Sequence, residues 1–85
     1  MEVLLTIQRF HPSRIDHIRF NALAPALDYI KMVISEEENT TIVKAGYWAV
    51  YRALKADRSC LVATSMYCRY TLFFEEGRKE SVVKG

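Results

Sequence analysis

Residues 41–58 divide into two chemically distinct sides when they are wound as an α-helix at ~100° per residue. One side collects small and apolar residues: Ile42, Ala45, Gly46, Ala49, Ala53 and Ala56, flanked by Val43, Val50 and Leu54. The other side collects basic and aromatic residues: Lys44, Trp48, Tyr51, Arg52 and Lys55, with Arg58 at its edge. The pattern predicts a helix over 41–58 whose small side lets another backbone approach closely and whose basic-aromatic side faces outward.

A strand is the alternative for the same segment, because several of its residues favour β structure. These are Thr40, Thr41, Ile42, Val43, Tyr47 and Trp48. As a strand, however, one face would alternate apolar residues with Lys44 and Arg52. The helix separates polar from apolar positions better, so we prefer it.

The first segment of the chain alternates with the two-residue period of a strand. Val3, Leu5 and Ile7 alternate with Leu4, Thr6 and Gln8, which predicts a strand over 2–10. His11-Pro12-Ser13 then interrupts the pattern, and Ser13 is a plausible N-cap with Asp16 three residues later.

Two helices are predicted between this strand and residue 36. Apolar residues at Ile15, Ile18, Ala22 and Leu23 predict a short helix over 14–23. Pro25 ends or kinks that helix and is well placed to begin the next. A broad apolar stripe then predicts a helix over 25–36, formed by Ala26, Leu27, Ile30, Val33 and Ile34.

Residues 60–74 contain no Gly, Pro, Asn or Asp and predict either one long strand or a hairpin that turns near 63–65. In one strand, eight steps of ~3.3 Å would separate Cys60 from Cys68. In a hairpin with a three-residue loop, the two cysteines would lie opposite each other, close enough to be bridged. A charged, frayed tail is expected over 76–85, with a further short edge strand at 81–83.

These elements predict a single small α+β domain over 1–85, in which two or three antiparallel strands (2–10, 60–74) are packed on one face by two or three helices (14–23, 25–36, 41–58). The chain has 85 residues, of which 51% are hydrophobic. No apolar run approaches the ~20 residues that cross a bilayer. Two cysteines are too few for a disulfide framework, which favours a reducing, cytoplasmic location.

The sequence contains no assembled catalytic or metal-binding motif. His11, His17, Cys60 and Cys68 are of the right types for zinc, but their spacings match no usual pair of ligands. No nucleophile lies in a known signature, and three glycines at 46, 77 and 85 form no phosphate-binding loop. We therefore expect no enzyme, no cofactor and no metal, and a metal-dependent activity is the least favoured function.

The favoured function is that of a small regulatory or inhibitory protein that binds a protein partner stoichiometrically, as accessory proteins of mobile elements do. Its partner would present an acidic surface to the predicted binding residues. These are Lys44, Trp48, Tyr51, Arg52 and Lys55, together with Tyr67 and Arg69 on the strand face opposite the core. The alternative is that the polar side of helix 41–58 is a solvated face with no binding role.

Nucleic acid is the alternative ligand. Helix 41–58 would then enter a groove, as in a winged helix-turn-helix, and its cations would contact phosphates. The net charge of +2 is low for a strong nucleic-acid binder, so only this local patch could serve. Free edges of a small sheet also predict a homodimer.

Overall fold

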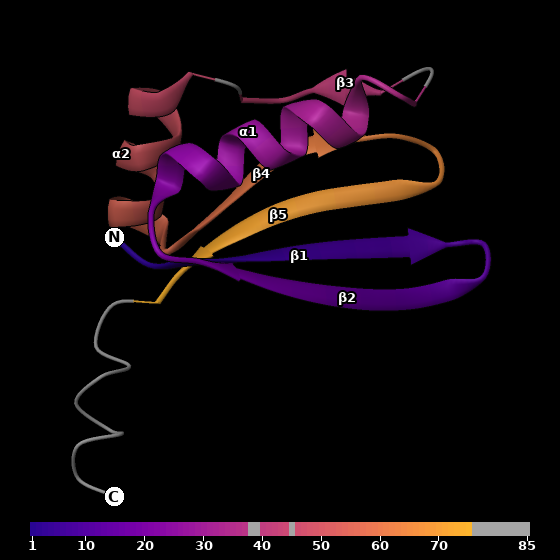
Figure 1. The fold of residues 1–85 in the computed structure, drawn as a ribbon, viewed down its shortest axis with the longest axis horizontal. Helices are drawn as coiled ribbons and strands as arrows, with labels where there is room; N and C mark the ends of the chain where they lie inside the picture. Colours follow the sequence, from indigo (N-terminus) through magenta and orange to yellow (C-terminus); the bar gives the residue numbers. More distant parts are fainter. Residues whose placement is uncertain (38–39, 45, 76–85) are drawn as a thin grey trace, which may run out of the picture.

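The computed structural model describes residues 1–37, 40–44 and 46–75. They form a single antiparallel sheet of five strands in the order β2-β1-β5-β4-β3, with two helices (Figure 1). The elements are β1 (Val3–Phe10), β2 (Ser13–Phe20), α1 (Leu23–Ile34), β3 (Thr41–Ile42), α2 (Tyr47–Asp57), β4 (Ser59–Thr64) and β5 (Cys68–Phe74). The predicted α+β class is confirmed, but the prediction of two or three strands is too low.

The predicted strand over 2–10 is confirmed as β1, which lies inside the sheet between β2 and β5. Leu5 is opposite Ile18 on one side and Leu72 on the other, so these three side chains share one face. That face carries the core, and it is the face that the helices cover (Figure 1). The opposite face, which includes Thr6, carries no helix.

The predicted helix over 14–23 is wrong, because Ser13–Phe20 is strand β2. It pairs residue for residue with β1 across the two-residue turn at His11-Pro12. Ile15 and Ile18 are spaced as on one helix face, but in the strand they lie on opposite faces of the sheet. The pairing turns Ile18 and Phe20 toward the core and satisfies their backbone groups against β1, which outweighs the local helical pattern.

The predicted helix over 25–36 is confirmed as α1, which begins at Leu23 and ends at Ile34. Pro25 lies in its first turn, where a missing N–H costs nothing. Four residues of α1 are buried against the sheet: Leu23, Ala26, Leu27 and Ile30.

The predicted helix over 41–58 is helical only over Tyr47–Asp57, and its buried side is centred on Val50 and Leu54, which were predicted to flank the small residues rather than to lead the contact. The β-branched residues Thr41 and Ile42 pair with β4 as strand β3. The helix therefore begins later than predicted, at Tyr47. Val50 and Leu54 are the buried residues of α2, whereas Ala56 is exposed. Larger apolar side chains, which bury more area, therefore replace the predicted small-residue contact.

Residues 60–74 form a hairpin and not one long strand, but the hairpin turns at 65–67 rather than at 63–65. This shift places Cys60 opposite Leu72, so the two cysteines are not opposite each other and both are free. The turn is held by Ser65, whose Oγ accepts hydrogen bonds from the backbone N–H groups of Tyr67 and Cys68 at 3.1 and 3.0 Å. The predicted strand at 81–83 and tail at 76–85 lie outside the described residues.

A polar bond at the core ties the segment that follows α1 to the sheet. The Tyr70 side chain is fully buried, and its hydroxyl donates to Oε2 of Glu37 at 2.7 Å. The other Glu37 oxygen is 3.4 Å from the Thr40 hydroxyl, which donates to it. Glu37 thus fixes the connection that leads from α1 into β3. Neither helix of the described chain is long and apolar enough to cross a membrane.

We expect Tyr70→Phe to lower the free energy of unfolding by about 1–2 kcal/mol, because the hydrogen bond to a carboxylate is lost while the ring still fills the core. Urea unfolding followed by circular dichroism would measure the shift of the midpoint. Tyr67→Phe is the matched control, since the Tyr67 side chain is exposed. An equal shift in both variants would contradict the structural role of the Tyr70 hydroxyl.

Alkaline pH should destabilise the protein through the same tyrosine. Burial, followed by the bond to Glu37, raises the pKa of Tyr70 well above its usual range. A group whose pKa is raised on folding contributes stability below its unfolded pKa, about 10 for tyrosine, and loses it as pH rises further. Unfolding midpoints measured between pH 8 and 11 should therefore fall above about pH 10, and fall less steeply in Tyr70→Phe.

Candidate binding surface

The outward side of α2 carries the first group of predicted binding residues. Val50 and Leu54 hold the opposite side of the helix against β4 and β5. We call the outward group the α2 patch: Tyr47, Trp48, Tyr51, Arg52 and Lys55. In Figure 1, α2 stands at one end of the sheet.

Three aromatic rings of the α2 patch contact one another, with Tyr51 partly buried against the core and Tyr47 and Trp48 exposed beyond it. The Trp48 ring meets those of Tyr47 and Tyr51 edge to face, with centroids 5.0 and 5.5 Å apart. The two tyrosine rings are stacked at 6.4 Å. Trp48 remains 63% exposed and Tyr47 remains 40% exposed. The cluster is therefore ordered by contacts within the patch and keeps its largest ring accessible.

Cations border these rings. The Lys55 ammonium lies 6.0 Å from the centroid of Tyr51 and 5.1 Å from that of Phe74, and the Arg58 guanidinium lies 5.2 Å from Phe74. Arg58 ends α2 in the left-handed conformation, with φ of 65°. Arg52 is exposed one helical turn after Trp48. The patch thus combines positive charge with exposed aromatic surface.

Lys44 does not belong to the α2 patch, because α2 begins only at Tyr47. Its backbone N–H, like that of Val43, donates to the carbonyl of Val62, at 3.2 and 2.8 Å respectively. Lys44 therefore lies along β4, where its side chain is exposed.

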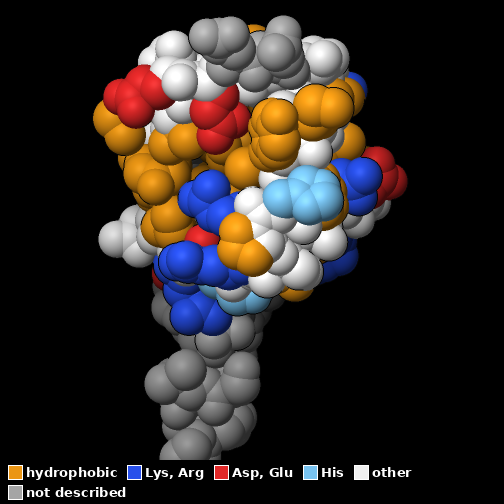
Figure 2. Space-filling view, turned by 90° about the vertical axis from the view of Figure 1, so that its right-hand side faces the viewer, with side chains coloured by type: hydrophobic (Ala, Val, Ile, Leu, Met, Phe, Trp, Pro, Cys, Tyr) orange, Lys and Arg blue, Asp and Glu red, His pale blue; other side chains and the backbone are white. Residues whose placement is uncertain are grey.

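Tyr67 and Arg69 lie at the other end of the sheet. Tyr67 is 57% exposed, and the Arg69 guanidinium lies 5.9 Å from the ring centroid of Phe10. Arg69 shares the strand face opposite the core with Thr71 and Phe73, as predicted, whereas Tyr67 lies in the turn before β5 and not on a strand. Figure 2 shows this end of the molecule, where basic side chains gather beside exposed hydrophobic ones.

The predicted binding residues therefore form two surfaces rather than one. Phe74 marks the end of β5 that contacts Lys55 and Arg58. Tyr67 precedes it by seven residues, which span ~23 Å at 3.3 Å per residue. A ligand that covers the α2 patch would have to be large to contact Tyr67 and Arg69 as well.

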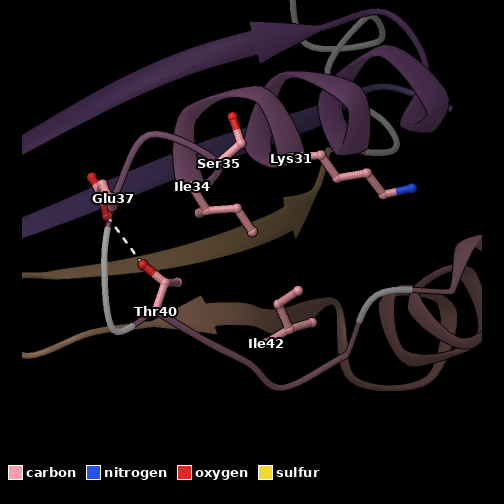
Figure 3. Close-up of a pocket in the computed structure, with 6 residues that line it drawn as sticks. All are labelled: Lys31, Ile34, Ser35, Glu37, Thr40 and Ile42. Atoms are coloured by element: carbon pink, nitrogen blue, oxygen red, sulfur yellow. Dashed lines mark hydrogen bonds between the residues drawn. The ribbon is translucent and has the colours of Figure 1, made fainter.

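An apolar groove separates α1 from β3, as Figure 3 shows. Its volume is about 410 Å³, and Ile34 and Ile42 face each other across it. Lys31 stands at one end, and Glu37 at the other end is bonded to Thr40 and Tyr70. A second cavity of about 160 Å³ adjoins it, sharing Ile34 and Ile42 and lined also by Leu27, Ile30 and Val62. Of the polar residues that line the groove, Ser35, Glu37 and Thr40 form hydrogen bonds within the fold, and Lys31 lies at the rim.

The histidines and cysteines lie apart. His17 Nδ1 is 3.1 Å from the Thr6 hydroxyl on the open face, whereas Cys60 and Cys68 are buried on the helix-covered face. Burial raises the pKa of the Cys60 thiol, which disfavours its nucleophilic thiolate form. Within residues 1–37, 40–44 and 46–75, no group of three or more His, Cys, Asp or Glu side chains is placed to hold a metal ion.

No family model matches the chain, no curated protein is similar to it, and no solved structure matches its fold.

Sequence reasoning did not include Tyr47 or Phe10 in a site. Tyr47 is one helical turn before Tyr51, so the i, i+4 spacing in the predicted helix already places it within the aromatic cluster. Phe10 meets Arg69 because β1 pairs with β5, a contact between distant parts of the chain. The Phe10–Arg69 contact thus depends on strand pairing that local periodicity does not give, whereas helical spacing could have added Tyr47 to the α2 group.

We expect fluorescence of Trp48, the only tryptophan, to be quenched more strongly by iodide than by caesium ions. The ring is exposed, and Arg52 and Lys55 concentrate anions around it. Stern–Volmer titrations at constant ionic strength would measure the ratio of the two constants. The double variant Arg52→Gln/Lys55→Gln should reduce that ratio, and weak quenching by both ions would contradict the exposure of Trp48.

Proposed function

We propose that the protein acts by stoichiometric, non-catalytic binding to a protein partner through the α2 patch. The observation that carries this proposal is the exposure of Trp48 within an ordered aromatic cluster. Trp and Tyr are the residue types that most often carry the affinity of protein interfaces. A regulatory or inhibitory role follows from occupancy of the partner and requires no chemistry from this chain.

The chemistry of the patch favours a partner with acidic groups. The Lys55 ammonium lies over the Tyr51 ring, and Arg52 is exposed one helical turn after Trp48. Carboxylates facing these two cations would raise the association rate and fix the orientation of binding, whereas Trp48 would supply most of the buried area. A helix needs a polar outward face to be solvated, but it does not need three aromatic rings there, which argues against a merely solvated surface.

Nucleic acid remains the second candidate for the same patch, because exposed rings can stack on bases and cations can contact phosphates. It would not bind as a helix-turn-helix, since residues 35–46, including β3, separate α1 from α2. A nucleic-acid complex would weaken steeply with salt. A protein complex anchored by Trp48 would depend on salt much less.

Site-specific photo-crosslinking tests the proposal in the full chain. A benzophenone amino acid replaces Trp48 in one variant and Met32 in the control, because Met32 is similarly exposed on α1. Illumination in the producing cells should give a discrete protein adduct from position 48 and not from position 32. Mass spectrometry identifies the adduct, and a nuclease-sensitive product instead would indicate nucleic acid and overturn the protein partner.

The affinity for the identified partner should then depend on the α2 patch. Trp48→Ala should weaken binding by about 2 kcal/mol or more, which is about thirty-fold, as measured by calorimetry. Lys55→Glu should weaken it as well, whereas Met32→Ala and Lys31→Glu on α1 serve as matched controls. Equal affinities of the Trp48 and Met32 variants would sink the assignment of the α2 patch.

A further inference from the structure

The two edges of the sheet differ. The β3 edge is only two residues long. The β2 edge runs for eight residues, and within the described residues no strand pairs with its outer side. Ile15, in the middle of this edge, is 56% exposed. A long exposed edge of this kind is a template for pairing with a further strand.

Two backbone hydrogen bonds at the ends of β1 show which groups of β2 face outward. The N–H of Phe10 donates to the carbonyl of Tyr67, and that of Glu75 donates to the carbonyl of Glu2. Even-numbered residues of β1 therefore turn their backbone toward β5, and odd-numbered ones turn it toward β2. In the β1–β2 register, the even residues of β2 bond to β1. The outward-facing backbone groups are those of Ser13, Ile15, His17 and Arg19.

We propose that β2 pairs antiparallel with β2 of a second copy of this chain, around a two-fold axis that passes between the two Ile15 residues. The two Ile15 residues then exchange a pair of backbone hydrogen bonds, and Ser13 of each copy does so with His17 of the other. The same axis places Arg14 of each copy opposite Asp16 of the other, on the helix-covered face. The two sheets become one continuous sheet with both helical layers on the same side.

Charge selects this register over its neighbours. A two-fold axis at residue 14 would place two Arg14 side chains opposite each other, and an axis at residue 16 would do so with two Asp16 carboxylates. Like charges at directly opposed positions are destabilising. An axis at His17 would place Asp16 opposite Ile18, so no unlike charge would face Asp16 across the axis. Only the axis at Ile15 opposes unlike charges and brings two apolar side chains together.

The ion pairs of the single chain allow this exchange. Asp16 accepts from Arg14 at 3.1 Å and from Arg9 at 3.3 Å, and these contacts hold the pKa of Asp16 below its usual value. The Arg14 side chain is 67% exposed, so its pair with Asp16 two residues away is worth little in water. Arg14 can therefore turn to Asp16 of the second copy while Arg9 still balances its own Asp16.

Disulfide trapping tests both the contact and its register in the full chain. Opposed residues of a hydrogen-bonded pair have Cα atoms about 5.5 Å apart, which suits a disulfide. Ile15→Cys should therefore form a covalent dimer under mild oxidation. His17→Cys is the matched control, because its two copies would lie four residues out of register. The natural cysteines are buried and should leave the unmodified chain uncrosslinked.

A second experiment uses charge and needs no new thiol. R14D alone and D16R alone each oppose like charges across the axis, so sedimentation equilibrium should find both monomeric at concentrations where the unmodified chain dimerises. An equimolar mixture should restore dimers, because each variant then faces the opposite charge. Circular dichroism of each variant checks that it is folded.

The outcomes decide the proposal. Dimers trapped through Ile15→Cys but not His17→Cys support it, as does restored association in the charge-variant mixture. Equal trapping of both cysteine variants, trapping through His17→Cys alone, or a chain that stays monomeric at millimolar concentration would overturn it. If D16R does not fold, Ile15→Lys replaces it, and undiminished association of Ile15→Lys overturns the proposal.

Discussion

The pairing of β1 with β5 is the constraint on which the rest of the structure depends. It joins the β1–β2 hairpin to the β4–β5 hairpin and makes them one sheet. Leu5, Tyr70 and Leu72 lie at this seam and are fully buried, and both helices pack on the face that they define. The α2 patch and the Phe10–Arg69 contact lie at opposite ends of the same pair of strands, so the seam also sets the distance between them.

The elements that sequence periodicity predicted correctly are those whose burial follows their own local pattern. Strand 2–10 alternates strictly, and α1 has a broad apolar stripe, so each could be recognised without its neighbours. Residues 14–23 could not, because Ile15 and Ile18 match a helix equally well. These residues form a strand because β1, two residues earlier in the chain, pairs with them through backbone hydrogen bonds. The periodicity of one segment does not indicate such a partner.

The candidate site was predictable in part for the same reason. Trp48, Tyr51 and Lys55 lie within one continuous helix, and their spacing alone brings them together. Lys44 was assigned to that helix because β-branched residues before it were read as helical, whereas they pair with β4. Tyr67 and Arg69 were assigned to the same surface without knowledge of the path of β5. That strand carries them to the far end of the sheet, away from the α2 patch.

The central seam also determines how the chain must fold. Residues of β1 and β5 that pair are roughly 60 to 70 positions apart, and closing so long a loop costs about 4 kcal/mol in chain entropy. The β1–β2 hairpin is local and can form first, which leaves the inner edge of β1 and the side chains of Val3, Leu5 and Ile7 uncovered until β5 arrives. The aggregation-prone edge during folding is therefore β1, a strand that the native protein hides completely.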